Sequence, residues 1–209
     1  GKKGTGKSHL SKLLVLELIT HGATVVILDL NGEYVNLGQT SDGKVNRFHK
    51  RIHVLTPGEN FKVTLSQTNL FVMLKIMSYA LNLPGTSSRE FRRIWKFLKE
   101  RGLLKLHELG EAIRGWKCNQ HVRDALFSRY YTLLHSNFFT DNMAEATLLL
   151  DLFHKTEERG GAIIIDLSNT SSVDRQIVVE YILGKLQELL SCLLYTSDAA
   201  DEGLGVDLG

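Results

Sequence analysis

Residues 1–8 read Gly1-Lys2-Lys3-Gly4-Thr5-Gly6-Lys7-Ser8, and they match the pattern G-x-x-x-x-G-K-[ST] at every position. Glycine allows positive φ and a close approach of the backbone to a ligand, so successive N–H groups can surround phosphate oxygens. The stretch therefore predicts a nucleotide phosphate loop, the Walker A motif. The alternative is a plain glycine-rich turn before a helix.

Each position of this loop has an expected role. We expect Lys7 to reach the β- and γ-phosphates and to act in catalysis, and the hydroxyl of Ser8 to hold Mg²⁺. The backbone amides from Gly4 to Ser8 would surround the β-phosphate, at the positive end of the helix that follows. The cofactors are then ATP and Mg²⁺. The predicted nucleotide-binding residues are Gly1, Lys3, Gly4, Thr5, Gly6, Lys7, Ser8 and His9.

The residues after the loop have the pattern of a parallel α/β unit. Leucines recur at helical spacing over 7–21, and Gly22 is a typical helix stop. Residues 23–30 are a short apolar run rich in β-branched side chains, which predicts a strand buried on both faces. A phosphate loop normally follows a strand, and none precedes Gly1 here. We therefore expect the chain to begin inside its domain.

Acidic residues follow this strand in the stretch 29–34, Asp-Leu-Asn-Gly-Glu-Tyr. In open α/β sheets, ligands bind beyond the carboxyl ends of the strands. Asp29 and Glu33 are therefore expected near the phosphates and the metal, with Glu33 as a candidate catalytic residue. The alternative is that both residues belong to a turn that ends the strand.

The phosphate loop, the helix and a strand ending in D-x-x-G-E-Y resemble the HerA/FtsK superfamily of ring-forming ATPases that pump DNA, in particular its HerA-like branch. Members usually read D-P-H-G-E-Y, whereas this chain has Leu30 and Asn31 in the middle. The resemblance implies ATP hydrolysis coupled to movement along double-stranded DNA. It also implies a homo-oligomeric ring, a hexamer, and a possible nuclease partner.

The residue pattern in the middle of the chain predicts short strands followed by helices. Residues 52–55 and 61–65 read as strands. A helical insertion is expected over 67–156, with helices at 68–82, 88–102, 106–114, 119–136 and 142–156. Cations recur along 88–102 between apolar residues. They could face DNA, but solvated charges over a buried aromatic face are the favoured interpretation.

A second buried strand is expected at 162–168, and Asp166 within it is a candidate metal ligand. Hydrolytic ATPases of this class normally have an acid directly after the metal aspartate, whereas Leu167 follows here. In HerA-like proteins an I-D-L-S strand precedes the Walker B strand. By that resemblance we expect Walker B and the catalytic acid beyond residue 191, and slow ATP hydrolysis by this chain.

The two ends of the chain differ in character. Residues 192–209 resemble a translated sequencing adapter, so the domain is expected to be 1–191, a partial P-loop ATPase domain, followed by a non-native tail. Without the four acids at 198, 201, 202 and 207, 25 cationic residues face 19 acidic ones, a net charge of +6. This mildly basic balance is compatible with nucleic acid.

Composition limits the remaining classes. A single cysteine before the tail, Cys118, fits the cytoplasm, and no stretch has the length and apolar character of a membrane span. The expected fold is α/β, a mostly parallel P-loop sheet with helices on both faces and a helical insertion. Two other functions stay open, namely another P-loop enzyme such as a kinase, and a regulatory module that binds nucleotide without hydrolysis.

Overall fold

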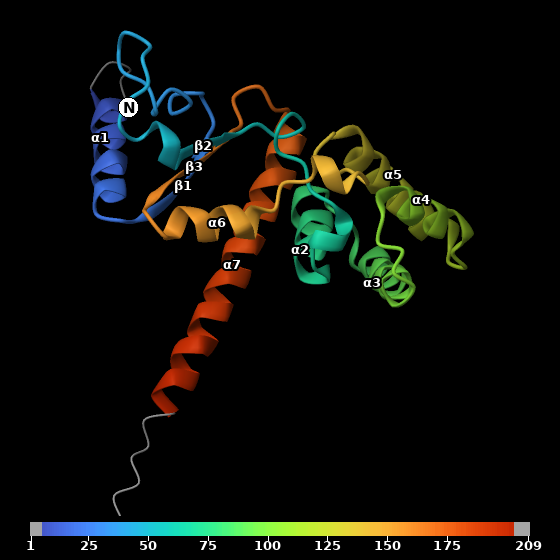
Figure 1. Ribbon diagram of the computed structural model, residues 1–209. Helices are drawn as coiled ribbons and strands as arrows, with labels where there is room; N and C mark the ends of the chain where they lie inside the picture. Colours follow the sequence, from blue (N-terminus) through green and yellow to red (C-terminus); the bar gives the residue numbers. More distant parts are fainter. Residues whose placement is uncertain (1–5, 203–209) are drawn as a thin grey trace, which may run out of the picture.

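The fold is built on a small parallel sheet (Figure 1). A computed structural model describes residues 6–202, with side chains up to residue 191. The sheet contains β1 (Thr24–Asp29), β2 (Ile52–Leu55) and β3 (Gly161–Asp166), in the order β1-β3-β2. Both pairs are parallel, so all three strands end at the same edge, which we call the carboxyl edge.

The central strand β3 separates two apolar layers. Ala162 and Ile164 point to one face, where they pack in a cluster with Ile19 of α1 (Lys7–Thr20). Ile163 and Ile165 point to the other face and join the large core that contains residues of α6 (Leu149–Glu157) and α7 (Ser172–Glu202). This alternation follows from the two-residue period of a strand. Helices on both faces of a parallel sheet confirm the predicted fold class.

The strand predicted at 23–30 is less buried than expected. β1 is only half-buried along most of its length, whereas the first five residues of β3 are buried. Within the described residues β1 pairs with β3 alone, so it lies at an edge of the sheet. The apolar run of β1 is explained by its two faces, which are both covered. One edge of the strand has no paired neighbour among the described residues.

Helices fill the chain between β2 and β3. They are α2 (Leu70–Lys75), which continues as a π-helical turn η3 (Ile76–Ala80), then α3 (Gly85–Glu100), α4 (Leu106–Gly115) and α5 (Gln120–His135). Two 3₁₀ turns lie among these helices, η2 (Leu65–Gln67) and η4 (Met143–Glu145), and a third, η1 (His49–Arg51), directly precedes β2. α2 and its π turn pack on α7. α3 packs on α2, α4 and α5. Residues of α7 and β3 belong to the same large core, which links the helical part to the sheet.

Two predicted elements are wrong. Residues 61–65 form no strand; Val63 makes one isolated bridge with Phe139, and Thr64 then caps η2. The helix predicted at 142–156 is divided into η4 and α6. The amide of Thr147 donates to the carbonyl of Lys62 at 2.7 Å, which holds the chain extended between them. In both cases a contact distant in sequence replaces the local pattern.

Glycines allow the strands to approach α1 at the edge opposite the carboxyl edge. Gly160 has φ +68°, and a Cβ there would lie 2.6 Å from the backbone of Gly22. A Cβ on Gly161 would lie 2.4 Å from the carbonyl oxygen of Arg51. The turn after α1 and the start of β3 thus meet backbone to backbone.

None of the helices in the described part of the chain combines the length and the apolar character needed to cross a bilayer.

Candidate nucleotide site at the carboxyl edge of the sheet

Two aspartates end neighbouring strands at the carboxyl edge. Asp29 of β1 and Asp166 of β3 are partners in the strand register. The amide of Leu167 donates to the carbonyl oxygen of Asp29 at 2.9 Å, so the pairing continues one residue past the strand. The sheet therefore brings together the acidic residues that the sequence places more than a hundred positions apart.

The carboxylate of Asp29 is used within its own turn. It is buried, with 3% of its surface exposed. One oxygen accepts the amides of Asn31 at 3.3 Å and Glu33 at 3.0 Å, and the other accepts the amide of Tyr34 at 2.7 Å. A carboxylate with three amide donors holds a turn firmly. Asp29 thus lies where expected, but its contacts match the alternative of a turn that ends the strand.

Glu33 lies on this turn with an exposed side chain. Gly32 before it has φ +68°, and a Cβ there would lie 3.3 Å from the hydroxyl oxygen of Ser168. The turn after β1 therefore packs against the turn after β3. Asp29 and the close approach at Gly32 together position Glu33 at the carboxyl edge.

Asp166 has a different set of contacts. Its side chain is half-buried, and one carboxylate oxygen accepts the amide of Ser168 at 3.0 Å and the Ser168 hydroxyl at 2.7 Å. Among the described residues, no donor is assigned to the other oxygen. Ser168 orients the carboxylate and leaves one oxygen for a ligand. This is the arrangement expected of a metal-binding aspartate with a supporting partner.

The start of α1 belongs to the same edge. α1 and β1 are joined by a tight turn at Gly22, so the helix begins near the end of the strand (Figure 1). The Nζ atom of Lys12 lies 5.9 Å from the ring centre of Tyr34, which ties the helix to the turn after β1. The phosphate loop therefore leads into a helix whose amino end lies at the carboxyl edge.

The first turn of α1 is exposed and carries no acidic residue. Gly6 caps it with φ 71° and ψ 4°, a left-handed conformation that glycine adopts without strain. Lys7, Ser8 and His9 follow on the helix, with exposed side chains. The predicted residues Gly1, Lys3, Gly4 and Thr5 lie outside the described residues. A helix start without a side-chain cap favours an anion through its backbone amides and its dipole.

The residues at this edge fit Mg²⁺ bound together with phosphate. Mg²⁺ keeps several waters and takes one or two protein oxygens besides phosphate oxygens. Ser8 supplies a hydroxyl and Asp166 a carboxylate oxygen. No group of three or more His, Cys, Asp or Glu side chains in the described part of the chain could hold a metal by itself. The donors therefore suit a metal that arrives with a nucleotide.

Sequence reasoning missed two contributors, Ser168 and Lys12. A serine two residues after a strand-ending aspartate is a common local hydrogen-bond pattern, so Ser168 could have been identified as the partner of Asp166. Lys12 could not, because its contact with Tyr34 depends on how α1 packs on the sheet.

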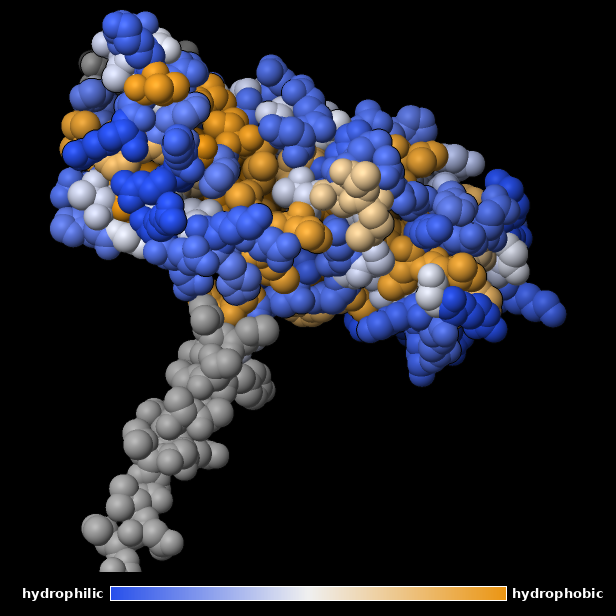
Figure 2. All heavy atoms as spheres, in the orientation of Figure 1, coloured by the Kyte–Doolittle hydropathy of each residue, from blue (hydrophilic) through white to orange (hydrophobic). Residues whose placement is uncertain are grey.

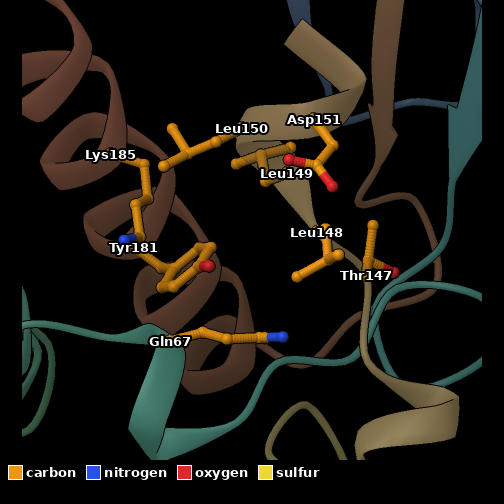
Figure 3. Close-up of a pocket in the computed structure, with 8 residues that line it drawn as sticks. All are labelled: Gln67, Thr147, Leu148, Leu149, Leu150, Asp151, Tyr181 and Lys185. Carbon is orange, nitrogen blue, oxygen red and sulfur yellow. The ribbon is translucent and has the colours of Figure 1, made fainter. Parts of the chain in front are cut away.

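A separate cavity of about 200 Å³ lies between the start of α6 and α7 (Figure 3). Leucines 148–150 line one side, and Tyr181 lines the other. Lys185 also lines the cavity and pairs with Glu188 at 2.9 Å. The cavity is smaller than the roughly 300 Å³ at which ligand pockets usually begin, and mostly apolar. We therefore do not assign the nucleotide to it.

Comparison with protein families finds one family that covers most of the chain. The model of the family "Helicase HerA, central domain" matches residues 1–186, which include the phosphate loop, Asp29, Glu33 and Asp166. Neither the curated proteins nor the solved structures include a significant match to the chain. The parallel sheet and the phosphate pattern agree with a P-loop ATPase domain of the HerA/FtsK type. The chain belongs to the family of the helicase HerA central domain.

Proposed function

We propose that the protein to which this domain belongs hydrolyses ATP and couples hydrolysis to movement along double-stranded DNA as part of a homo-oligomeric ring, and that the chain by itself hydrolyses ATP slowly. The observation that carries the proposal is the position of Lys7 and Ser8. They complete a full phosphate-loop pattern and occupy the first turn of α1, at the edge where Asp166 ends β3. Family membership supports the ATPase part, and the hexameric ring and a nuclease partner rest on the family resemblance.

The roles of the side chains follow from their charges and positions. Lys7 and the free amides at the start of α1 bind and neutralise the β- and γ-phosphates. Ser8 and the open oxygen of Asp166 hold Mg²⁺, which neutralises charge on the phosphate oxygens when bound. Asp29 fixes the turn, and its exposed neighbour Glu33 orients the attacking water. Asp29 is therefore a positioning residue, and Glu33 is the candidate catalytic carboxylate.

Nucleotide binding tests the phosphate loop directly. Lys7→Ala should weaken binding of a fluorescent ATP analogue and lower turnover by about 100-fold, the usual effect of losing one charge-stabilising donor. Lys50→Ala is the matched control, because Lys50 is an exposed cation outside the site. If Lys7→Ala binds and hydrolyses ATP as the wild type does, the phosphate-loop assignment is wrong.

DNA-dependent turnover tests the coupling. We expect linear double-stranded DNA to raise the ATP hydrolysis rate of the wild type, and Lys7→Ala to abolish the stimulated rate. ATP binding with no stimulation would reject the translocase. Phosphoryl transfer to an added small-molecule acceptor would then favour a kinase, and binding without any transfer would favour a regulatory module.

A further inference from the structure

A basic groove lies between α2, with its π turn, and α3. It consists of two adjoining hollows of about 470 Å³ and about 600 Å³, which share Leu70 and Arg92. We call it the α2–α3 groove. In Figure 2 the end of the molecule formed by α3, α4 and α5 is mostly hydrophilic, with smaller hydrophobic areas. The groove shares no residue with the nucleotide site.

One wall of the groove is a row of cations on α3. The row is Arg89, Arg92, Lys96 and Lys99, which steps of three, four and three residues place on one side of the helix. Arg92, Lys96 and Lys99 line the hollows, and Arg89 lies outside them. At 1.5 Å per residue the row is about 15 Å long. Phe91, Ile94, Trp95 and Leu98 are buried, so the aromatic side of α3 belongs to the core, as the favoured interpretation of the sequence expects.

Few acids neutralise this row. Lys96 lies 3.8 Å from Glu100, an exposed pair that contributes little in water. Glu100 is the one acidic residue that lines the two hollows. Within the described residues, Arg92 and Lys99 have no acidic group within 4.0 Å. The groove therefore keeps a net positive charge that a polyanion can neutralise.

The other wall carries exposed aromatic rings. Phe71 on α2 is 57% exposed, and Tyr79 in the π turn is 69% exposed. Lys75 lies between them along the helix, with its Nζ atom 4.7 Å from the centre of the Phe71 ring and 2.6 Å from the amide oxygen of Gln187. Two large rings left in water at the border of a basic groove offer flat surfaces for stacking.

We propose that the α2–α3 groove binds a single-stranded nucleic acid. The cations of α3 contact successive phosphates, and Phe71 and Tyr79 stack against unpaired bases, the combination that single-strand sites use. A duplex hides the faces of its bases and could use only the cations. An acidic peptide could also use only the cations, so the two exposed rings favour the single strand.

Binding of labelled oligothymidylate, followed by fluorescence anisotropy without ATP or Mg²⁺, tests the proposal. An oligomer of about ten nucleotides is within the usual size range of a single-strand site. If three cations each contact one phosphate, a plot of the logarithm of the binding constant against the logarithm of the salt concentration should have a slope of about −2. Lys96→Ala/Lys99→Ala should reduce this slope by about 1.4 units.

The aromatic wall is tested by Phe71→Leu/Tyr79→Leu, which keeps apolar bulk and removes the rings. Both side chains are exposed, so the fold should tolerate the change. Affinity should fall about tenfold or more with the salt slope unchanged, because stacking is not ionic. Lys50→Ala/Lys117→Ala and Tyr131→Leu are the matched controls; these residues are exposed outside the groove and should leave affinity unchanged.

Three results would overturn the proposal. The first is unchanged affinity in both groove variants. The second is a duplex of equal length that binds as tightly as the single strand. The third is a joint result: a polyglutamate peptide with the same charge as the oligomer displaces it from the protein, and the variant Phe71→Leu/Tyr79→Leu binds the oligomer with wild-type affinity. Because the assay contains no ATP, each of these results leaves the proposed ATPase untouched, and loss of ATP binding in Lys7→Ala leaves this groove untouched.

Discussion

Asp29 and Asp166 are register partners at the ends of β1 and β3, yet of the two only Asp166 keeps a carboxylate oxygen to which no described residue donates. Three backbone amides occupy Asp29, whereas Asp166 is held through one oxygen by Ser168. The same residue type therefore builds a turn at the end of one strand, and at the end of the neighbouring strand it is held through a single oxygen.

Replacement of Asp29 should destabilise the turn that carries Glu33. Asp29→Asn replaces one of the two accepting oxygens by an NH₂ group and removes the negative charge to which the backbone amides now donate. The free energy of unfolding should therefore fall by about 1–3 kcal/mol. Urea denaturation measures this loss. Asp124→Asn is the control, because Asp124 is exposed and bonds only a side chain, Gln120. Equal stability of the two variants would contradict the role given to Asp29.

Replacement of Asp166 should affect Mg²⁺ rather than folding. Asp166→Asn keeps an oxygen that can accept both Ser168 bonds, so stability should change little, while the metal-dependent part of ATP affinity should disappear. Ser168→Ala should weaken Mg²⁺ affinity by about tenfold, because it frees the carboxylate to rotate. Titration of Mg²⁺ at fixed ATP measures both. Wild-type Mg²⁺ dependence in Asp166→Asn would remove this residue from the site.

The pair formed by His107 and Asp141 should make stability depend on pH. Their side chains lie 2.7 Å apart, and Asp141 also accepts the amides of Leu106 and His107 at the start of α4. The hydrogen bond with Asp141 raises the pKa of His107 above its usual value. Burial pushes the pKa of Asp141 upward, but these hydrogen bonds outweigh it and hold the pKa below its usual range.

The direction of the pH effect follows from these pKa shifts. The raised pKa of His107 stabilises the fold below the unfolded pKa of about 6.5, and this contribution is lost as pH rises through the folded pKa. The lowered pKa of Asp141 stabilises above about 3.9 and is lost as pH falls through its folded pKa. The difference in unfolding free energy between wild type and His107→Gln should therefore be larger near about pH 5.5 than near about pH 8.5. A difference that stays constant with pH would show that the pair is not linked to folding.

Addition of one methyl group at Gly161 should damage the sheet. A Cβ there would lie 2.4 Å from the carbonyl oxygen of Arg51 and 2.7 Å from Cγ2 of Thr156, so backbone would have to move. Gly161→Ala should lower the free energy of unfolding by about 1–3 kcal/mol. Gly115→Ala is the control, because a Cβ at Gly115 meets no atom within 4 Å. Thermal unfolding compares them, and equal melting temperatures would contradict the close approach.

Much of the fold could be predicted from local patterns. The helix at 7–21, the strands at 23–30, 52–55 and 162–168, and the helices at 106–114 and 119–136 agree with the structure within a few residues. Their apolar spacing matches the period of the element that forms. The pattern at 61–65 was misleading, because Phe61, Val63 and Leu65 alternate only to reach the large core, and Val63 pairs with a single residue.

The sequence by itself determined the phosphate-loop pattern, the family and the parallel sheet, because each depends on neighbouring residues and their spacing. Only the tertiary structure decided how each aspartate is hydrogen-bonded within the described residues, since register and turn packing set the partners of each carboxylate. It also decided that Arg92 of α3 lines the same hollow as the exposed rings of Phe71 and Tyr79, because the packing of α3 on α2 sets which sides meet.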